Sequence, residues 1–273
     1  MQQPRSEHVL GDGEAELLRL DRQALALSAP TRALLREVGL AAEMEVLDLG
    51  SGTGRVAMAI AELVGPAGRV IGLDRSVAAL DHARRQVAAA GFANIEFVAA
   101  DVTEPLPVPV ADAVVCRLVL ARQADPVAVL RTWSASVRPG GLLVAMEFDV
   151  AAAHAVPEVP EVTQALGWIG AAFDEVGPSQ RLGPRLGAVF REAGLGDVRM
   201  LGGQIYVAPD DPGGPAMLAG VVGSLLPAIT GTGIATGQEV GIETLPQRLG
   251  EALRRSGAVF CPPTLVACWG TVP

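Results

Sequence analysis

The sequence predicts an α/β fold in which a parallel sheet carries helices on its faces. Between residues 44 and 149, short runs typical of strands alternate with longer runs typical of helices. The first strand-like run, EVLDLG, leads into a glycine-rich turn, as at the carboxyl edge of an open α/β sheet. With 50% hydrophobic residues in a chain of 273, a substantial core can form. We expect one elaborated domain instead of two.

Each element of this region has its own pattern. The expected helices cover about 54–64, 76–90 and 125–137, and RPGG closes the last of them as a helix stop and turn. Upstream, residues 13–39 read as two helices that are broken near Pro30. The expected strands are EVLDLG, RVIGLD, IEFVAA, DAVVCRLV and LLVAMEFDV, followed by DVRMLGGQIYVA and TLVACWGTV. Further helices are indicated in EVTQALGWIGAAFDEV, LGPRLGAVFREAGL, PAMLAGVVGSLLPAI and LPQRLGEALRRSG.

Composition excludes several classes of function. The formal net charge of −9, without a basic cluster, argues against nucleic acid or an acidic membrane surface as partner. All 21 basic residues are arginine, which removes Schiff-base chemistry, the P-loop lysine and a lysine base. Three cysteines without a CxxC pair indicate reduced core thiols. No leader and no apolar run of membrane-spanning length is evident, so we expect a soluble cytoplasmic protein.

The glycine-rich turn could hold a phosphate, a dinucleotide, or a smaller ligand with a charged tail. A dinucleotide fingerprint needs G-x-G-x-x-G, but Arg55 stands where its third glycine should be, after Gly50, Gly52 and Gly54. Asp48 ends the first strand just before these glycines. Its carboxylate would repel a pyrophosphate and attract an ammonium group. A cationic ligand is therefore favoured over NAD.

Two more carboxylates follow successive strands. Asp74 ends the second strand, where it can accept hydrogen bonds from both hydroxyls of a ribose. Asp101 follows the third strand, where it can accept from an exocyclic amine while Val102 packs on a purine. Each aspartate alone could simply cap the next helix. Three of them in register at neighbouring strand ends are better explained by a ligand.

These stretches resemble a known family. VLDLGSGTG, VIGLDRS, VAADV, ADAVVCRLVL and VRPGGLLVAMEFD resemble, in order and spacing, the motifs of the class I S-adenosylmethionine-dependent methyltransferases. HVLGDGEAELLRLDRQ and GPRLGAVFREAGL extend a weaker match towards a bacterial small-molecule branch. The resemblance implies a Rossmann-like, doubly wound, mostly parallel seven-stranded sheet with helices on both faces, an antiparallel last strand and helical lid insertions.

The resemblance also implies how the chain is divided. Residues 1–43 would form helices that cover the cofactor site, and 44–208 would form the cofactor-binding core, with a substrate-side insertion at 150–180. Residues 209–256 would form a lid, and 257–273 the final antiparallel strand.

The cofactor implied by the resemblance is S-adenosylmethionine, with S-adenosylhomocysteine as its product. The loop Gly50–Gly54, including Ser51 and Gly52, would hold the methionine part, with Asp48 near its ammonium group. Asp74 would bind the ribose, Arg75 and Val102 would flank the adenine, and Asp101 would accept from its amino group. Carbonyls around Cys116 and Arg117 would receive the ammonium, and Arg19 or Gln23 would close over the carboxylate.

Two departures from the family pattern affect the substrate and metal predictions. Arg122, in ARQADP, replaces a residue that often faces the substrate in relatives. The histidine-and-metal arrangement of catechol-type enzymes is absent, because the only histidines are His8, His82 and His154. We expect no metal.

The insertions are expected to cover the methyl-transfer site, because both follow strands that end at the carboxyl edge of the sheet. Their apolar composition favours a hydrophobic small-molecule substrate. The alternative is that these helices only bury core or form a homodimer contact. The residues expected to contact the substrate are Arg122, Trp168, Phe173, Tyr206, Leu218, Val222 and Leu226.

Methyl transfer is an in-line displacement that needs a base only if the nucleophile must lose a proton. The candidate bases are His154, Glu147 and Asp149, with Tyr206 and His8 as outsiders. His154 is the most suitable by pKa, although it could equally be an exposed loop histidine. Glu147 could instead be half-buried and paired with an arginine such as Arg117.

The leading hypothesis is a methyltransferase acting on a hydrophobic small molecule, in secondary metabolism and natural-product biosynthesis. One alternative is a methyltransferase-like cyclase or binding protein that keeps the cofactor structurally. A second is a nicotinamide-dependent oxidoreductase, which Arg55 and Asp48 disfavour. The substrate and the accepting atom cannot be identified from the sequence.

Overall fold

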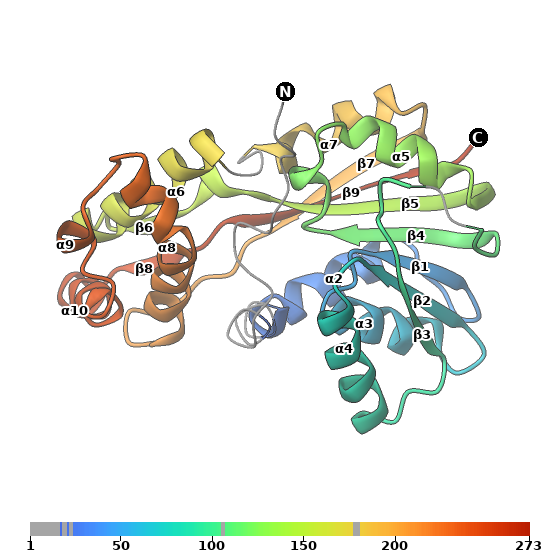
Figure 1. The fold of residues 1–273 in the computed structure, drawn as a ribbon, viewed down its shortest axis with the longest axis horizontal. Helices are drawn as coiled ribbons and strands as arrows, with labels where there is room; N and C mark the ends of the chain where they lie inside the picture. Colours follow the sequence, from blue (N-terminus) through green and yellow to red (C-terminus); the bar gives the residue numbers. More distant parts are fainter. Residues whose placement is uncertain (1–16, 18–20, 22–23, 105–106, 177–180) are drawn as a thin grey trace. The chain divides into compact units, whose positions relative to one another are not determined.

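The computed structural model describes residues 17–273 apart from 18–20, 22–23, 105–106 and 177–180. The described residues form two compact units (Figure 1). The sheet unit comprises Leu17–Phe148, Leu182–Gly203 and Leu265–Pro273. The described part of the helical unit lies within Asp149–Arg181 and Gln204–Thr264.

The sheet unit contains a seven-stranded sheet in the order β3-β2-β1-β4-β5-β9-β7. The pairs β1–β2, β1–β4, β2–β3 and β4–β5 are parallel, whereas β7 and β9 pair antiparallel. This confirms the mostly parallel sheet with one antiparallel strand. The strands are β1 (Glu45–Leu49), β2 (Arg69–Asp74), β3 (Ile95–Ala99), β4 (Ala111–Arg117), β5 (Val137–Asp149), β7 (Gly196–Gly203) and β9 (Thr264–Thr271).

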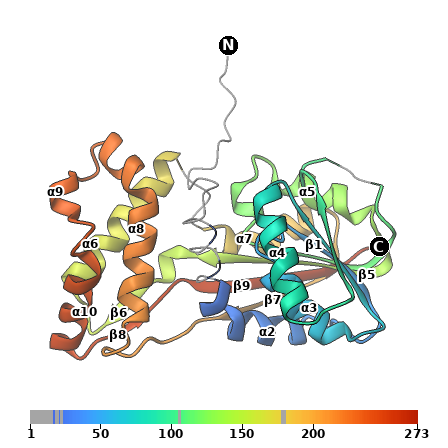
Figure 2. The same ribbon diagram turned by 60° about the horizontal axis from the view of Figure 1, so that its bottom comes forward.

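Helices cover both faces of this sheet (Figures 1 and 2). Alternate strand residues point to opposite faces, so Val46 packs in one core with α2 and α3, while Leu47 packs in another with α5 and α7. Strands β1, β2 and β4 are thus buried on both sides, as inner parallel strands require, whereas the residues of β3 and β7 are mostly exposed or half-buried. The helices are α2 (Ser28–Glu37), α3 (Arg55–Val64), α4 (Val77–Ala89), α5 (Pro126–Ser134) and α7 (Leu182–Glu192), with a short 3₁₀ helix η1 (Leu120–Arg122).

The element boundaries follow the predictions closely, except that α2 begins at Ser28 and includes Pro30, where a break was expected, and that the chain differs after α5. The helix ends at Ser134, and the RPGG stretch lies inside the long strand β5 instead of in a turn. Val137 already pairs with Ala111, and the pairing then shifts register before Leu142. Gly140 adopts φ +75°, which a glycine accommodates without strain at such an irregularity.

The helical unit has its own hydrophobic core, to which α6 contributes from one insertion and α8 and α10 from the other. This shared core is why two compact units form where the sequence suggested one elaborated domain. A small antiparallel sheet, which the sequence analysis did not predict, pairs β6 of the first insertion with β8, from the stretch 257–273 that was predicted as the final strand. The elements are η2 (Val150–Ala152), β6 (His154–Val156), α6 (Pro160–Val176), α8 (Gly213–Gly231), α9 (Gly237–Val240), α10 (Leu245–Ser256) and β8 (Val259–Cys261).

Helix α8 corrects the expectation that no apolar run reaches membrane-spanning length. Its 19 residues are long and apolar enough to cross a membrane by length and composition. Its buried side chains, Leu218, Val222, Leu225 and Ile229, recur at helical spacing and lie in the core of the helical unit. In this structure α8 is the central helix of that core.

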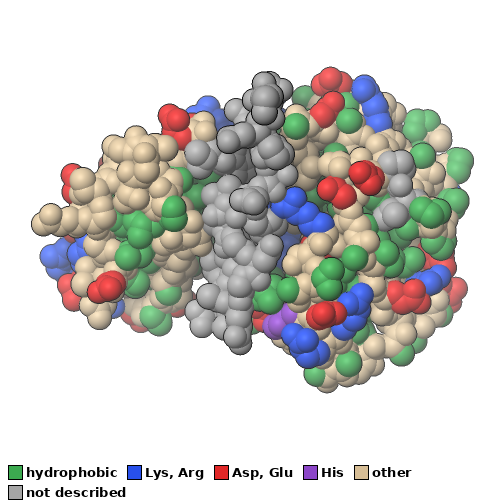
Figure 3. All heavy atoms as spheres, in the orientation of Figure 1, with side chains coloured by type: hydrophobic (Ala, Val, Ile, Leu, Met, Phe, Trp, Pro, Cys, Tyr) green, Lys and Arg blue, Asp and Glu red, His purple; other side chains and the backbone are tan. Residues whose placement is uncertain are grey.

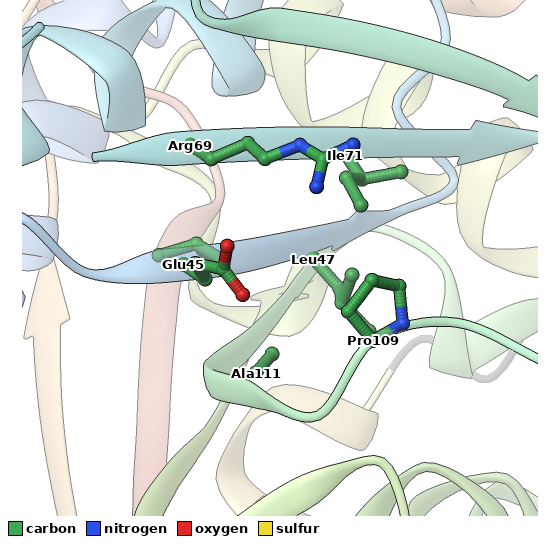
Figure 4. A pocket seen from close by; sticks show the side chains of 7 residues that line it. Glu45, Leu47, Arg69, Ile71, Pro109 and Ala111 are labelled. Carbon is green, nitrogen blue, oxygen red and sulfur yellow. The ribbon is translucent and has the colours of Figure 1, made fainter. Parts of the chain in front are cut away.

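The surface of the described residues has two further features. On the face in Figure 3, acidic and arginine side chains are interspersed among uncharged ones on both units. A small pocket lies at the amino ends of β1, β2 and β4, the opposite end of the strands from the turn (Figure 4). It is lined by Glu45, Val46, Leu47, Arg69, Ile71, Pro109 and Ala111.

Candidate functional site

The turn after β1 is built from glycines because its backbone requires them. Gly50, Gly52 and Gly54 have φ angles of +65°, +51° and +80°. A Cβ on Gly50 would lie 2.4 Å from Val119 Cγ2, so this position also lacks room for a side chain. The Ser51 N–H donates to the Leu73 carbonyl at 2.9 Å, which joins the turn to the end of β2. The turn is thus anchored at the carboxyl edge of the sheet.

Asp48 is buried at the end of β1 with only 1% of its surface exposed. Burial raises the pKa of its carboxyl to about 7; the Arg117 guanidinium opposes this shift, and the Asp74 carboxylate adds to it. Among the described residues, neither Asp48 Oδ2 nor the nearby Ser51 Oγ has a hydrogen-bond partner. A buried acceptor without a partner is costly, so these atoms are suited to bind a ligand donor.

Asp74, at the end of β2, anchors the glycine-rich turn. Its Oδ2 accepts from Gly52 N at 2.8 Å, and its Oδ1 accepts from Ser76 N at 2.9 Å. The cap of α4 is Ser76, whose Oγ accepts from Ala79 N, so capping is not the role of Asp74. Each carboxylate oxygen can accept a second hydrogen bond, which leaves capacity for a ribose.

The three residues predicted to bind the adenine differ in their exposure to solvent. Asp101 is exposed, and its Oδ1 accepts from Thr103 N and Thr103 Oγ1 at 2.8 and 2.7 Å. These hydrogen bonds hold the pKa of Asp101 below its ordinary value. Val102 is buried in the core, and its carbonyl accepts from Trp133 Nε1 at 2.7 Å. Arg75 is exposed at the start of the loop before α4.

At the end of β4, Cys116 and Arg117 differ in environment. The Cys116 thiol is buried, and burial raises its pKa well above the ordinary value. Burial lowers the pKa of Arg117 to about 10, while the Asp48 carboxylate acts in the opposite direction. Arg117 Nη1 donates to Thr31 Oγ1 at 2.9 Å, so Arg117 pairs with Thr31 and not with Glu147 as the sequence allowed.

Glu147 corrects a second expectation, because its side chain is fully buried instead of half-buried. Its Oε1 accepts from Leu120 N at 2.7 Å and from Ala121 N at 3.3 Å. Burial raises the pKa of Glu147 to about 7, although the backbone N–H groups of residues 119–121 and the Arg122 guanidinium oppose this shift. The carboxylate is therefore engaged with the backbone after β4.

The other candidate bases lie in the helical unit. Asp149 is partly exposed where β5 ends. His154 is exposed in β6, and its Nδ1 lies 2.8 Å from the Ala152 carbonyl. His8 lies outside the described residues, as do the two predicted carboxylate-binding residues Arg19 and Gln23.

The predicted substrate residues divide by burial. Leu218, Val222 and Trp168 are buried in the core of the helical unit, and their contact with a substrate stays a prediction. Phe173 and Leu226 are partly buried at the margin of that core, and Tyr206 is 73% exposed. Arg122 is exposed at the end of η1.

Sequence reasoning missed two features of the site. Arg55, interpreted only as a break in the dinucleotide fingerprint, donates two hydrogen bonds of 2.8 Å to Asp21. Two features of the sequence could have predicted this pair. Arg55 lies in the first turn of α3, and the N-terminal segment contains an acidic residue. The contact of Val119 with Gly50 had no signal, because an apolar residue after a strand is common.

The residues at this edge fit the cofactor that the family resemblance implies. The unpartnered Asp48 Oδ2 can accept from an ammonium group, and the Asp74 carboxylate from a ribose. Within the glycine-rich turn Gly52 is partly exposed, and a Cβ there would meet only the Gly50 carbonyl, at 3.9 Å. Within the described residues, no three His, Cys, Asp or Glu side chains gather as a metal site.

The chain was compared with known proteins. A family model described as a methyltransferase domain matches residues 40–176, half of the chain. The ubiquinone/menaquinone biosynthesis C-methyltransferase UbiE of Coxiella burnetii is 37% identical over 107 residues, which cover 38% of this chain and 42% of that enzyme. The chain therefore matches less than half the length of this relative.

Two solved structures share the fold over most of the chain. A methyltransferase of Bacillus halodurans covers 90% of this chain and 99% of its own, with a TM-score of 0.58 and 17% identity. The cyclase SpnF covers 91% of this chain and 83% of its own, with a TM-score of 0.51 and 16% identity. The family model and the seven-stranded sheet agree with the sequence motifs. The chain belongs to the class I S-adenosylmethionine-dependent methyltransferases.

Proposed function

We propose that this protein transfers the methyl group of S-adenosylmethionine to a hydrophobic small molecule, a secondary metabolite. The observation that carries the proposal is the buried Asp48 carboxylate, which has an unpartnered oxygen among the described residues and lies beside the glycine-rich turn. A buried acidic acceptor at this point suits a ligand ammonium group and opposes a pyrophosphate. The bound cofactor would supply an electrophilic methyl group.

The protein's own residues would bind and orient the reactants. Asp48, with the carbonyls around Cys116 and Arg117 at the end of β4, would receive the ammonium group, and Asp74 would hold the ribose. Orientation and exclusion of water can supply much of the rate of such a displacement. Asp149 and His154 remain the candidates for a base if the nucleophile carries a proton, because Glu147 is already engaged with backbone N–H groups.

The helical unit is the proposed source of the apolar substrate wall. The chain leaves the sheet unit after β5 and β7 and returns at α7 and β9. Strand β5 belongs to the parallel part of the sheet with β1 and β4, so the chain leaves the sheet unit at the carboxyl end of β5. Ligands of open α/β sheets bind outside the carboxyl edge. The half-buried apolar residues Met217 and Val221 of α8 are better wall candidates than Leu218 and Val222.

Calorimetry and product mass test the proposal in two steps. The protein should bind S-adenosylhomocysteine and not NAD. Incubation with S-adenosylmethionine and a panel of apolar metabolites should add the mass of one methylene group to a panel member. The panel should include hydroquinones, since the name of the Coxiella relative points to a carbon acceptor in quinone biosynthesis. Binding of NAD alone would overturn the proposal, and conversion of a substrate without a gain in mass would support a cyclase instead.

A further inference from the structure

The carboxylate of Glu147 holds two consecutive backbone N–H groups of the segment that follows β4. Its Oε1 accepts from Leu120 N at 2.7 Å and from Ala121 N at 3.3 Å, with 1% of the residue exposed. Hydrogen bonds to a buried charged acceptor are among the stronger ones in proteins. Loss of this acceptor would leave two N–H groups without a partner at the edge of the core.

The segment that Glu147 holds contains a strained residue. Leu118 adopts φ +60°, a left-handed conformation that is unfavourable for a residue with a Cβ. The Leu118 N–H donates to the Met146 carbonyl at 2.8 Å. Met146 and Glu147 are neighbours in β5, so this strand fixes the segment through one backbone and one side-chain acceptor. Such strain persists only where the surroundings enforce it.

The same segment packs directly on the glycine-rich turn. Val119 is 8% exposed, and its Cγ2 occupies the space where a Cβ of Gly50 would lie, at 2.4 Å. A shift of Val119 would therefore be transmitted to Gly50, because the two are already in close contact. All of these residues belong to the sheet unit.

We propose that Glu147 is a positioning residue, whose carboxylate fixes residues 118–121 so that Val119 supports Gly50 and the cofactor-binding turn keeps its shape. The expected effect on cofactor binding rests on the proposed function. The ordering of the turn by Glu147 is independent of that function. Glu147 acts through the backbone that it holds and does not contact the reactants.

The test compares two substitutions of Glu147. Glu147→Gln keeps an oxygen that can accept from Leu120 and Ala121, so its affinity for S-adenosylhomocysteine should stay within about fivefold of the unaltered protein. Glu147→Leu has no acceptor and should bind at least about tenfold more weakly. Hydrogen exchange should also speed up at the amides of residues 118–121 and 50–54 in Glu147→Leu, without ligand.

A matched control separates positioning from general stability. Leu143→Ala removes a fully buried side chain from the same strand, away from the turn, and should lower the midpoint of thermal unfolding. Its folded form should bind S-adenosylhomocysteine like the unaltered protein. Equal losses of affinity in Leu143→Ala and Glu147→Leu would overturn the proposal, as would a folded Glu147→Leu protein with normal affinity and exchange.

If Glu147→Leu does not fold, Val119→Ala provides a second test of the proposal. It removes the contact with Gly50 while Glu147 keeps its hydrogen bonds. Exchange should then speed up at residues 50–54 and stay unchanged at Leu120 and Ala121, and unchanged exchange at 50–54 would overturn the inference. If the unaltered protein binds no S-adenosylhomocysteine, the proposed function fails, while the exchange measurements still decide whether Glu147 orders the turn.

Discussion

Arg55 and Asp21 form a two-pronged ion pair, in which Arg55 Nε and Nη2 each donate to one carboxylate oxygen of Asp21 at 2.8 Å. Arg55 is the residue that stands in place of the third glycine of a dinucleotide fingerprint. The hydrogen bonds of this pair, and after them the attraction of the opposite charges, lower the pKa of Asp21 and raise that of Arg55. Arg55, the residue that departs from the fingerprint, therefore joins the N-terminal segment to the first turn of α3.

Restoring the glycine should not restore dinucleotide binding. Arg55→Gly completes the G-x-G-x-x-G pattern, but Asp48 still places a carboxylate where a pyrophosphate would lie. We expect no NAD binding by calorimetry, and a stability loss of about 1–2 kcal/mol from the lost pair and the helical glycine. The control is Arg84→Ala in the exposed pair with Asp81, which should cost under about 0.5 kcal/mol. Micromolar NAD binding by Arg55→Gly would show that Asp48 does not exclude the dinucleotide.

Asp74→Ala should weaken binding of S-adenosylhomocysteine by at least about tenfold. The substitution removes the proposed ribose acceptor and also the acceptor for Gly52 N, so the turn loses an anchor. Isothermal calorimetry on protein with an unchanged circular dichroism spectrum measures the effect. Asp81→Ala, an exposed aspartate of α4, is the control and should bind normally. Normal affinity in Asp74→Ala would restrict Asp74 to a structural role.

Binding of S-adenosylhomocysteine should strengthen as the pH rises towards 7. Burial raises the pKa of Asp48 to about 7 in the free protein, so this carboxyl is mostly protonated below that pH. A ligand ammonium group favours the ionised form, and each pH unit below the pKa should weaken binding by about tenfold. Affinities at pH 6 and pH 8 should therefore differ by about tenfold. Asp48→Asn should bind weakly at both values and lack this slope, whereas a slope that persists in Asp48→Asn would assign it to another group, Glu147 first.

Val222→Asp should unfold the helical unit instead of blocking a substrate. Val222 is fully buried among apolar side chains, so an unpaired carboxylate there should cost several kcal/mol, at least about 3. Val221→Asp, on the adjacent half-buried position, should fold with a loss below about 1.5 kcal/mol. If Val221 belongs to the substrate wall, Val221→Asp should raise KM and leave affinity for S-adenosylhomocysteine unchanged. Thermal unfolding and turnover measured together decide between these outcomes.

The sequence predicted the sheet unit well because its signals are local. The strands β1 and β2 are short apolar runs that end at Leu49 and Asp74, next to glycine or cap residues, and parallel strands buried on both faces have this pattern. The short strands β6 and β8 were missed because three-residue strands give no periodic pattern. Their pairing depends on contacts between residues about a hundred positions apart.

The candidate site could be predicted only in part, for a related reason. The strand-end positions of Asp48 and Asp74 follow from the order of elements. The burial of Glu147 and of Val222 depends on which neighbours pack around them, and a single sequence does not specify this. Helix α8 is apolar on every side, so its sequence has no amphipathic pattern. Nothing in the sequence therefore indicates that Val222, and not Val221, faces the core.

The position of β9 between β5 and β7 has a consequence for the order in which the protein can assemble during synthesis. It is the last of the seven strands to leave the ribosome, and it is the strand that joins β7 to the rest of the sheet. Until it emerges, β5 has an open edge, and β7 has no neighbour with which to form its ladder. Domains generally fold as units while the chain is being made. Here the sheet can be completed only after both stretches of the helical unit have been synthesised, so β5 keeps an unpaired edge while residues 150–263 are being made.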